Sequence, residues 1–259
     1  MKSKLSIVKI GGNLIKDAEQ LSKVLQLFSK KEGHKILVHG GGKKATEIGN
    51  RLGIEAKMTN GRRITDAASL EVAIMVYGGL VNKSIVAKLQ SLGTNALGMS
   101  GADGDAIQAH KRPVKDVDFG FVGDVDGVQS ENLSKLLDAG FTPVFCALTH
   151  DGKGQLFNTN ADTIAAELAV GMANLYVTSL FYCFEKKGVL EDMTNEDSVI
   201  EHINTQKYQA LLQAGSIADG MLPKMHNCFY ALENKVQKVH IGDASMLNQN
   251  PSPHTTLTL

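Results

Sequence analysis

The chain has 259 residues, of which 43% are hydrophobic and 21% are charged, and its 27 basic and 27 acidic side chains give a net charge of zero. This length suffices for one large α/β domain or for two lobes that share a sheet. The balanced charge argues against a nucleic-acid or membrane-surface binder, because such affinity rests on an excess of basic residues.

Cysteine usage and hydropathy give the expected cellular setting. Cys146, Cys183 and Cys228 lack CxxC spacing and each lies in an apolar stretch, so we expect reduced core thiols and no zinc site. No segment approaches 18 uninterrupted apolar residues, so no membrane span is predicted. We therefore expect a cytoplasmic protein.

The first 65 residues alternate between strand and helix patterns. Residues 5–10 form a short apolar run, residues 16–30 carry apolar side chains at helical spacing, and residues 35–38 are again strand-like. A glycine turn and a helix over residues 43–51 follow. Strand, glycine turn and helix in repetition indicate a parallel sheet covered on both faces. Residues 54–65 indicate a β-hairpin or an irregular excursion.

The middle of the chain continues this pattern. Asp66 can N-cap a long helix that reaches about residue 92 and is interrupted at Gly78 and Gly79. Later elements are predicted as strands at 96–99 and 142–147, a peripheral hairpin of 107–110 with 121–125, and helices at 132–139 and 161–171.

The regular alternation of predicted strands and helices ends after residue 175. A strand begins at 175–177, residues 181–198 are rich in loop signals, helices are expected at 207–214 and 220–234, and residues 236–241 form a last strand. We place a boundary near residue 175, which divides the chain into an N-terminal lobe of residues 1–175 and a C-terminal lobe of residues 176–259.

Three glycine-rich turns follow predicted strands, at residues 11–12, 40–42 and 98–104. Glycine lets backbone N–H groups approach a ligand closely, and a helix N-terminus favours an anion. A tight turn between strand and helix explains any one of them equally well, but three together favour a phosphate-binding function. The chain has no GxxxxGK[ST] and no GxGxxG motif, which disfavours a P-loop enzyme or a simple dinucleotide-binding protein.

Phosphoryl transfer needs positive charge on the moving group, and two lysines can supply it. Lys9 lies in the first strand next to the glycine turn, and Lys224 lies in "ADGMLPKM" at the start of a helix. Either lysine alone would be interpreted as a solvated surface residue.

Further polar residues lie at the start of the 161–171 helix and in the 54–65 hairpin. In "FNTNAD", Asn158 and Asn160 can hydrogen-bond a carboxylate and Asp162 can orient lysines, although Asn160 or Asp162 can equally be a helix N-cap. Arg62 and Arg63 in "NGRRIT" can clamp a carboxylate, or either can be surface charge.

Seven stretches in this order resemble the amino acid kinase family, specifically its members that phosphorylate an acylated glutamate: "VKIGGN", "HGGGKKATEIGNRLG", "NGRRIT", "GMSGADGDAI", "GFVGDV", "FNTNADTIAAELA" and "ADGMLPKM". The resemblance implies a three-layer αβα sandwich around a mostly parallel sheet. It implies that residues 1–175 bind the acylglutamate and dimerise, that residues 176–259 bind ATP, and that the γ-phosphoryl group of MgATP passes to the side-chain carboxylate.

The resemblance also implies catalytic roles. Lys9 and Lys224 match the lysines that stabilise the transferring phosphoryl group, and Asp162 matches the carboxylate that holds both. Gly11 and Gly12 would offer amides to the phosphates. The implied cofactor is ATP with Mg²⁺, without a protein-bound metal site.

For the acceptor site, the resemblance implies that Gly41 and Gly42 line the acylglutamate pocket. Arg63, which occupies the arginine position of "NGxRxT", and Asn158 would hold the substrate carboxylates. Asn160 would lie close by.

The chain departs from the family pattern on the nucleotide side. Relatives carry a "[ST]DVxGV"-like turn where this chain reads "TSLFYCFEKKGVLED". Aligning Thr178 and Ser179 with its start puts Leu180 at the aspartate position and requires inserted residues before Gly188. The tail "PHTTLTL" puts His254 near the place of the family's "GT" pair.

The sequence is compatible with more than one activity. The acyl group can be acetyl, the family default, or succinyl. A member of the family that acts on aspartate, carbamate or UMP also fits, and so does a catalytically silent ligand-binding protein. The first strand begins within five residues of the N-terminus, whereas arginine-inhibited relatives carry an extra helix there. We therefore expect a homodimer that arginine does not inhibit.

Overall fold

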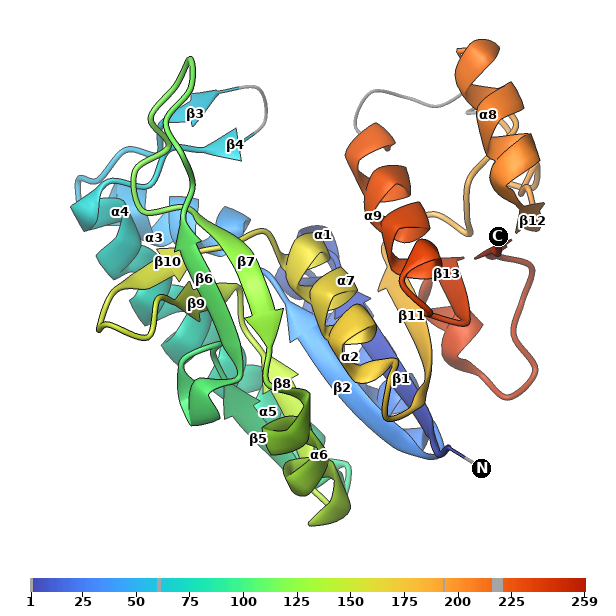
Figure 1. Ribbon diagram of the computed structural model, residues 1–259, viewed down its shortest axis with the longest axis horizontal. Coiled ribbons are helices and arrows are strands. Elements are labelled where there is room, and N and C mark those ends of the chain that lie inside the picture. Colours follow the sequence, from blue (N-terminus) through green and yellow to red (C-terminus); the bar gives the residue numbers. More distant parts are fainter. Residues whose placement is uncertain (1, 60–61, 193, 216–220) are drawn as a thin grey trace.

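An eight-stranded sheet forms the middle layer of the structure (Figure 1). The computed structural model describes residues 2–59, 62–192, 194–215 and 221–259. The strand order is β12-β14-β13-β11-β1-β2-β8-β5, and all neighbours are parallel except β13 and β14. The mostly parallel sheet predicted from the sequence is confirmed. The strands are β1(Lys4–Ile10), β2(His34–His39), β5(Ala96–Met99), β8(Thr142–Phe145), β11(Val177–Cys183), β12(His202–Ile203), β13(Lys238–Gly242) and β14(Thr255–Leu257).

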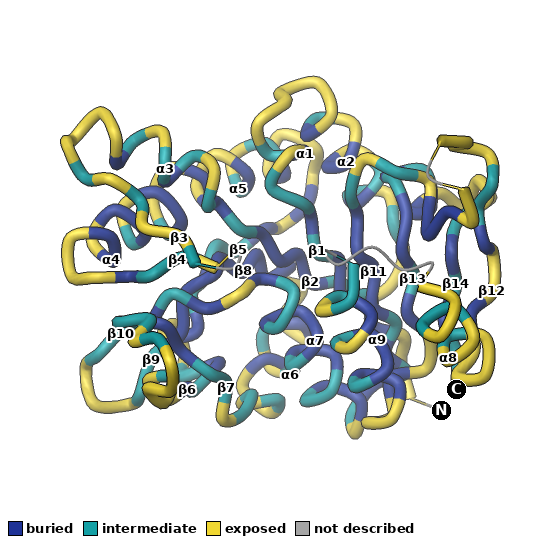
Figure 2. Tube along the Cα trace, turned by 90° about the horizontal axis from the view of Figure 1, so that it is seen from above, coloured by how far each residue is buried: buried dark blue, intermediate teal, exposed yellow. Residues whose placement is uncertain are grey.

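Helices cover both faces of this sheet, which confirms the three-layer αβα arrangement (Figure 2). One layer holds α1(Gly12–Lys16), α2(Ala18–Lys30), α3(Gly42–Arg51) and α5(Asn82–Ser91), and the opposite layer holds α6(Ser130–Asp138), α7(Ala161–Met172) and α9(Leu222–Glu233). Helix α8(Thr205–Gln213) packs beside the edge strand β12. Two short 3₁₀-helices are η2(Asp103–Asp105) and η3(Ala244–Leu247).

Two smaller sheets lie beside the β5 end of the structure. One has the order β10-β9-β6-β7, in which the predicted hairpin of β6(Ile107–Lys111) and β7(Gly123–Val128) pairs antiparallel and joins β9(Leu148–His150) and β10(Leu156–Asn158). The other is the predicted hairpin of β3(Met58–Thr59) and β4(Arg62–Arg63). Residues 60–61 of its "NGRRIT" turn lie outside the described residues.

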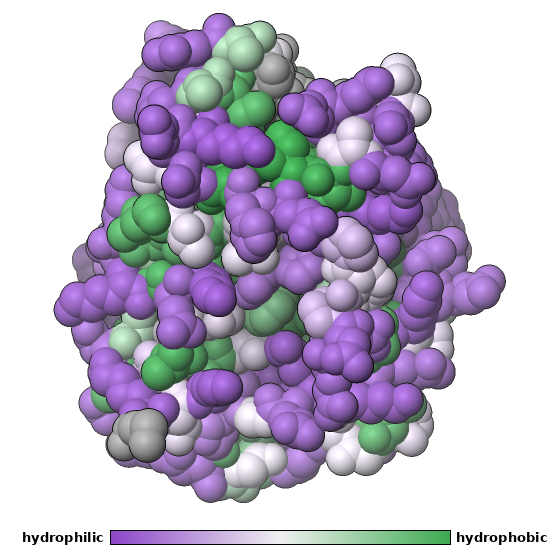
Figure 3. Space-filling model, turned by 90° about the vertical axis from the view of Figure 1, so that its right-hand side faces the viewer, coloured by the Kyte–Doolittle hydropathy of each residue, from purple (hydrophilic) through white to green (hydrophobic). Residues whose placement is uncertain are grey.

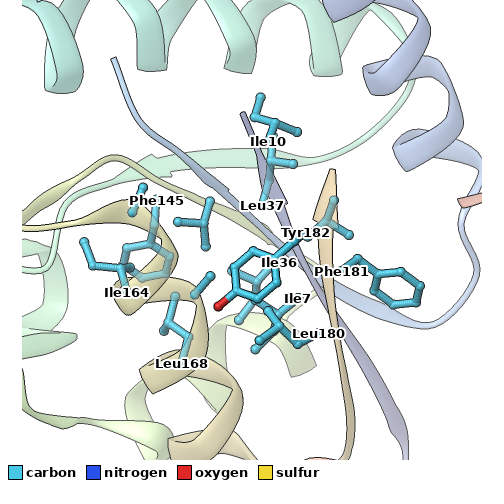
Figure 4. Close-up of a cluster of buried hydrophobic side chains, with 14 of the residues drawn as sticks. Ile7, Ile10, Ile36, Leu37, Phe145, Ile164, Leu168, Leu180, Phe181 and Tyr182 are labelled. Atoms are coloured by element: carbon cyan, nitrogen blue, oxygen red, sulfur yellow. The ribbon is translucent and has the colours of Figure 1, made fainter. Parts of the chain in front are cut away.

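The central strands are buried on both faces, as expected for a covered parallel sheet. Ile7, Val8 and Ile10 of β1 are fully buried. In β11, Tyr182 points toward α7 whereas Phe181 points to the opposite face (Figure 4). The three cysteines are free and buried, and burial raises the pKa of Cys146 and of Cys183 to about 12, which confirms the prediction of inert core thiols.

The long helix after the β3–β4 hairpin contains a π-helical segment. It runs from Ala67 to Ser91 as α4(Ala67–Ala73), the π-helix η1(Ile74–Val81) and α5. Asp66 caps it as predicted, accepting from the Ser69 amide at 2.9 Å. The predicted interruption at residues 78–79 is this widened turn. The helix is long and apolar enough to cross a membrane, but α5 packs against α2, β5 and β8 and is therefore a core helix.

The sequence prediction for residues 181–183 is wrong. Residues 181–183 were expected in a loop, yet they are the last three of β11, and Leu180 is fully buried opposite Ile7 of β1 and Val239 of β13. The turn begins only at Phe184. The alignment that puts Leu180 at the family's aspartate position therefore places that position inside β11 and not in a turn.

The central sheet is continuous across the boundary proposed at residue 175. Strand β11 lies beyond that boundary and pairs along its whole length with β1, which lies before it. The two lobes therefore share one sheet. The assignment of acceptor binding to residues 1–175 and nucleotide binding to residues 176–259 stays a prediction.

The strand assignment makes a stability prediction. Leu180→Ala should lower the free energy of unfolding by about 2–5 kcal/mol, because it leaves a cavity under a fully buried side chain. Glu185→Ala, in the exposed turn just beyond the strand, should change it by less than about 0.5 kcal/mol. Urea unfolding measures both. If the free energy of unfolding changed little in Leu180→Ala and strongly in Glu185→Ala, the alignment that places Leu180 in the turn would be correct.

Candidate active site

The predicted catalytic residues lie at the carboxyl edge of the central sheet, where ligands bind in open α/β sheets. Lys9 is the penultimate residue of β1, Asp162 lies in the first turn of α7, and Lys224 lies in the first turns of α9. Residues 218–220, which precede α9 in "ADGMLPKM", lie outside the described residues.

One carboxylate joins the two lysines. Lys9 Nζ lies 2.6 Å from Asp162 Oδ1, and Lys224 Nζ donates to Asp162 Oδ2 at 2.9 Å. The three side chains are 13%, 16% and 20% exposed for Lys9, Lys224 and Asp162, so the group is largely buried but retains contact with solvent. The ion pairs fix the separation of two cations that come from residues far apart in the sequence.

Electrostatics keep this carboxylate ionised. Burial raises the pKa of Asp162, but the positive charges of Lys9 and Lys224 outweigh burial and lower that pKa to about 2. The position of Asp162 in the first turn of α7 also favours the ionised carboxylate, because a helix N-terminus favours a negative charge. The carboxylate of Asp162 is therefore ionised at neutral pH.

Tyr182 supports the same group and was missed by the sequence analysis. Its hydroxyl donates to the backbone carbonyl of Asp162 at 2.9 Å, and Lys224 Nζ lies 4.8 Å from the centre of its ring. The side chain is fully buried and points from β11 toward α7 (Figure 4). A tyrosine inside an apolar run was the only sequence signal for this role.

Asn160 is the N-cap of α7. Its side chain accepts from the backbone amides of Asp162 and Thr163 at 2.8 and 3.2 Å, so the N-cap alternative left open by the sequence holds for Asn160. The cap fixes where α7 begins and therefore where Asp162 lies. A contact of Asn160 with substrate stays a prediction.

The backbone amides of the two glycines after β1 differ in their hydrogen bonding. The Gly11 amide donates to the carbonyl of Cys183 at 2.9 Å and is therefore occupied in this structure. Gly12 is the first residue of α1, a position at which a helix leaves its amide without an intrahelical acceptor. Of this pair, Gly12 is the better candidate for phosphate binding.

The second glycine turn begins α3, with Gly41 as its N-cap and Gly42 as its first residue. Arg63 lies against it, because its Nη2 donates to the Gly42 carbonyl at 2.9 Å and to Thr46 Oγ1 at 2.7 Å. The structure thus brings together three of the predicted acceptor-site residues. Their arrangement leaves the first-turn amides of α3 for a ligand.

Asn158 joins this region through the β4–α4 connection. Its Nδ2 donates to Thr65 Oγ1 at 3.0 Å, and Thr65 lies two residues beyond Arg63. The β6–β7 connection packs on the same residue, since the Thr65 amide donates to the Phe119 carbonyl at 2.9 Å and the Phe121 amide donates to the Thr65 carbonyl at 2.7 Å.

Lys43 is a further cation that the sequence analysis did not select. Its Nζ donates to Asn13 Oδ1, which links the first turns of α3 and α1. The two glycine turns are therefore connected by a side-chain hydrogen bond. A lysine directly after "HGGG" was the available signal.

The geometry can hold a ligand that carries both phosphates and carboxylates. Two lysines and free helix amides lie at one edge of a covered parallel sheet, and an arginine lies beside the second glycine turn. Such donors stabilise dispersed negative charge. The fold and site define an α/β protein of the phosphate-transferring class.

Comparison with known proteins identifies the family. Residues 4–243 match the family described as "Amino acid kinase family", and the chain belongs to that family. The acetylglutamate kinase of Phocaeicola vulgatus is 53% identical over 249 residues, which cover 96% of this chain and 97% of that protein. This similarity spans nearly the full length of both proteins.

Solved structures of lower identity share the fold. An N-acetylglutamate synthase from Neisseria gonorrhoeae, complexed with coenzyme A and N-acetyl-glutamate, has a TM-score of 0.83 at 22% identity and covers 99% of this chain and 59% of that chain. A carbamate kinase from Giardia lamblia bound to AMP-PNP has a TM-score of 0.68 at 13% identity, covering 99% and 98%.

The low pKa of Asp162 predicts part of the acid unfolding. Because the folded pKa lies below the unfolded value near 3.8, Asp162 stabilises the fold above about pH 4, and this contribution of about 2 kcal/mol is lost as the pH falls toward 2. In Asp162→Asn, the free energy of unfolding should fall less steeply between pH 4 and 2. Urea titrations at several pH values measure the difference, and identical slopes in both proteins would contradict the assigned ion pairs.

Proposed function

We propose that this protein is an acetylglutamate kinase, which transfers the γ-phosphoryl group of MgATP to the side-chain carboxylate of N-acetyl-L-glutamate and yields an acyl phosphate in arginine biosynthesis. The observation that carries the proposal is the pair of lysines held by one carboxylate, Lys9 and Lys224 on Asp162. Identity of about half over nearly the full length with proteins named acetylglutamate kinase supports the substrate.

The lysines act on the transferring group. A lysine ammonium has three N–H donors. Each lysine contacts one carboxylate oxygen of Asp162, so both lysines keep donors for the phosphoryl oxygens. In phosphoryl transfer, charge spreads over the equatorial oxygens of the moving group, and fixed cations stabilise that charge without reorganisation. The negative charge of Asp162 offsets the repulsion between the two lysines and keeps both in place during the transfer.

The acceptor binds next to the second glycine turn. Arg63 has further guanidinium donors beyond those used on Gly42 and Thr46, and it can bind a carboxylate of the substrate. The first-turn amides of α3 and the side chain of Asn158 complete the acceptor site.

The phosphoryl donor is ATP with Mg²⁺. Membership of this kinase family supports ATP, and the carbamate kinase of similar fold was solved with AMP-PNP. Over the described residues, no group of three or more His, Cys, Asp or Glu side chains is placed to hold a metal. Mg²⁺ therefore enters with the nucleotide phosphates, as is usual for this ion. A cytoplasmic location follows from this metabolic role.

The protein is also proposed to be a homodimer that uses the Ala67–Ser91 helix. Met75 and Leu80 on this helix are 53% and 49% exposed. The side of the molecule that carries α8 and β12 shows small apolar areas separated by hydrophilic side chains (Figure 3). Large exposed apolar residues on one helix favour burial against a second copy.

The catalytic assignment predicts that Lys9→Ala and Lys224→Ala each lower kcat by a factor on the order of 100–1,000, because each removes a cation from the transition state. Lys23→Ala, an exposed lysine on α2, is the matched control and should leave kcat unchanged. The measurement is N-acetylglutamate-dependent ADP release, with circular dichroism to show that each variant folds.

A panel of acceptors separates the candidate activities. N-acetyl-L-glutamate, N-succinyl-L-glutamate, aspartate and carbamate are compared, and the acyl phosphate is trapped with hydroxylamine. A preference for the succinyl compound would change the acyl group and keep the mechanism. Acylglutamate binding without ATP binding in calorimetry, together with no ADP release on any acceptor, would replace the kinase with a silent binding protein.

The dimer proposal makes its own prediction. Wild-type protein should elute with the mass of a dimer in size-exclusion chromatography with light scattering, and Met75→Glu with Leu80→Glu should shift it to a monomer, because a charge buried at an interface is costly. Val114→Glu, at another exposed apolar position, is the control and should stay dimeric. A wild-type monomer would disprove the proposal.

A further inference from the structure

The glycine turn of the acceptor site is held from beneath by buried polar groups. His39 is the last residue of β2 and is fully buried. Its Nδ1 lies 2.7 Å from the Gly40 carbonyl, and its Nε2 lies 3.0 Å from Asn82 Nδ2. A carbonyl only accepts, so Nδ1 carries the proton and Nε2 accepts from Asn82. Burial lowers the pKa of His39 to about 4, and the ring is neutral at physiological pH.

Asn82 can take only one orientation in this environment. Its Nδ2 also donates to the Val144 carbonyl at 2.9 Å, so the amide nitrogen must face both Val144 and His39. Its Oδ1 points toward Gly98, and a Cβ placed on that glycine would lie 2.0 Å from it. Asn82 therefore fixes the tautomer of His39, which in turn fixes the Gly40 carbonyl.

Tyr77 limits the same turn from the side. A Cβ placed on Gly41 would lie 2.5 Å from Tyr77 Cδ1, so the ring packs directly against the Gly41 backbone. Burial raises the pKa of the Tyr77 hydroxyl, and the positive charge of Arg63 nearby opposes this. The ring thus contacts the turn while its hydroxyl faces the arginine proposed to bind the substrate.

The π-helix η1 explains why both side chains reach the turn. In an α-helix, residues five apart point about 140° away from each other. Here the Asn82 amide donates to the Tyr77 carbonyl, the i→i−5 bond of a π-helix, which stacks the two residues on one face. The widened turn thus lets Asn82 reach Gly40 through His39 and lets Tyr77 pack against Gly41.

We infer that Asn82, through His39, and Tyr77 are positioning residues that hold the Gly40–Gly42 turn in the conformation that binds the phosphoryl acceptor. This inference rests on the proposed function, because the ligand of the turn is the acylglutamate. Neither residue contacts the transferring group. Their loss should weaken acceptor binding equally in the ground state and the transition state, which raises KM and spares kcat.

The test measures KM and kcat separately for the two substrates. Asn82→Leu should raise KM for N-acetylglutamate about tenfold, the effect of one lost hydrogen bond, while kcat and KM for ATP stay within about twofold. Asn95→Leu is the matched control, because it makes the same substitution at an exposed asparagine directly before β5, at the opposite end of the sheet strands from the glycine turn. It should leave both KM values unchanged.

A second pair of variants tests the link through His39. In His39→Asn, the amide nitrogen can stand in place of Nδ1 and donate to Gly40, whereas His39→Leu has no donor. The asparagine variant should keep an acceptor KM several-fold lower than that of the leucine variant. This pair also decides the question if Asn82→Leu does not fold.

The outcomes are distinguishable from a failure of the proposed function. Wild-type protein without N-acetylglutamate-dependent activity would disprove that function. An active wild type whose acceptor KM is the same in Asn82→Leu and in both His39 variants would disprove the positioning role. An equal rise of the KM for ATP and for the acceptor would also overturn it, since that indicates general loosening of the fold.

Discussion

Charge balance around Asp162 is the constraint on which the rest of the structure depends. Two lysines close to one another at the edge of a sheet repel, and a single buried carboxylate with its pKa lowered to about 2 offsets that repulsion. The three residues come from β1, α7 and α9, so this interaction ties a central strand to two helices of one layer. Asn160 and Tyr182 then act on Asp162, one by fixing the start of α7 and the other by holding its backbone carbonyl.

The parallel register of β1 makes this arrangement possible. Lys9 lies opposite Tyr182 of β11 and Val38 of β2, so the cation, the supporting tyrosine and the glycine turn after β2 reach the same edge of the sheet. The Gly11 amide continues the pairing to Cys183 beyond the strand. Because the edge is set by hydrogen bonds within the sheet, the site is built on rigid elements.

The sequence predicted the layers and the hairpins, and it selected the two lysines and the carboxylate that the structure brings into contact, because each has a local or motif signal. Alternating strands and helices indicated the sheet, and Asp66 indicated the start of a helix. The exact end of β11 was not predictable from pattern, since Phe181, Tyr182 and Cys183 form an apolar run next to polar turn residues. Strand pairing with β1 and β13 decides that the run is strand. Contacts between distant residues that lie outside the family motifs had no sequence signal. The hydrogen bond from Asn82 to His39 joins two elements that are 43 residues apart, and it follows from topology, which a single sequence read in windows does not contain.

The π-helix η1 carries two different surfaces on one turn. Tyr77 and Asn82 face the Gly40–Gly42 turn, the latter through His39, and Met75 and Leu80, also five residues apart, are exposed. Gly78 and Gly79 lie between them, and glycine costs about 1 kcal/mol relative to alanine in a helix, so packing rather than helix propensity maintains this segment. The helix therefore retains its widened turn only while the inner contacts persist. Burial of the outer residues against a second copy would stabilise the same turn, and the acceptor site and the proposed dimer surface thus depend on one set of backbone hydrogen bonds.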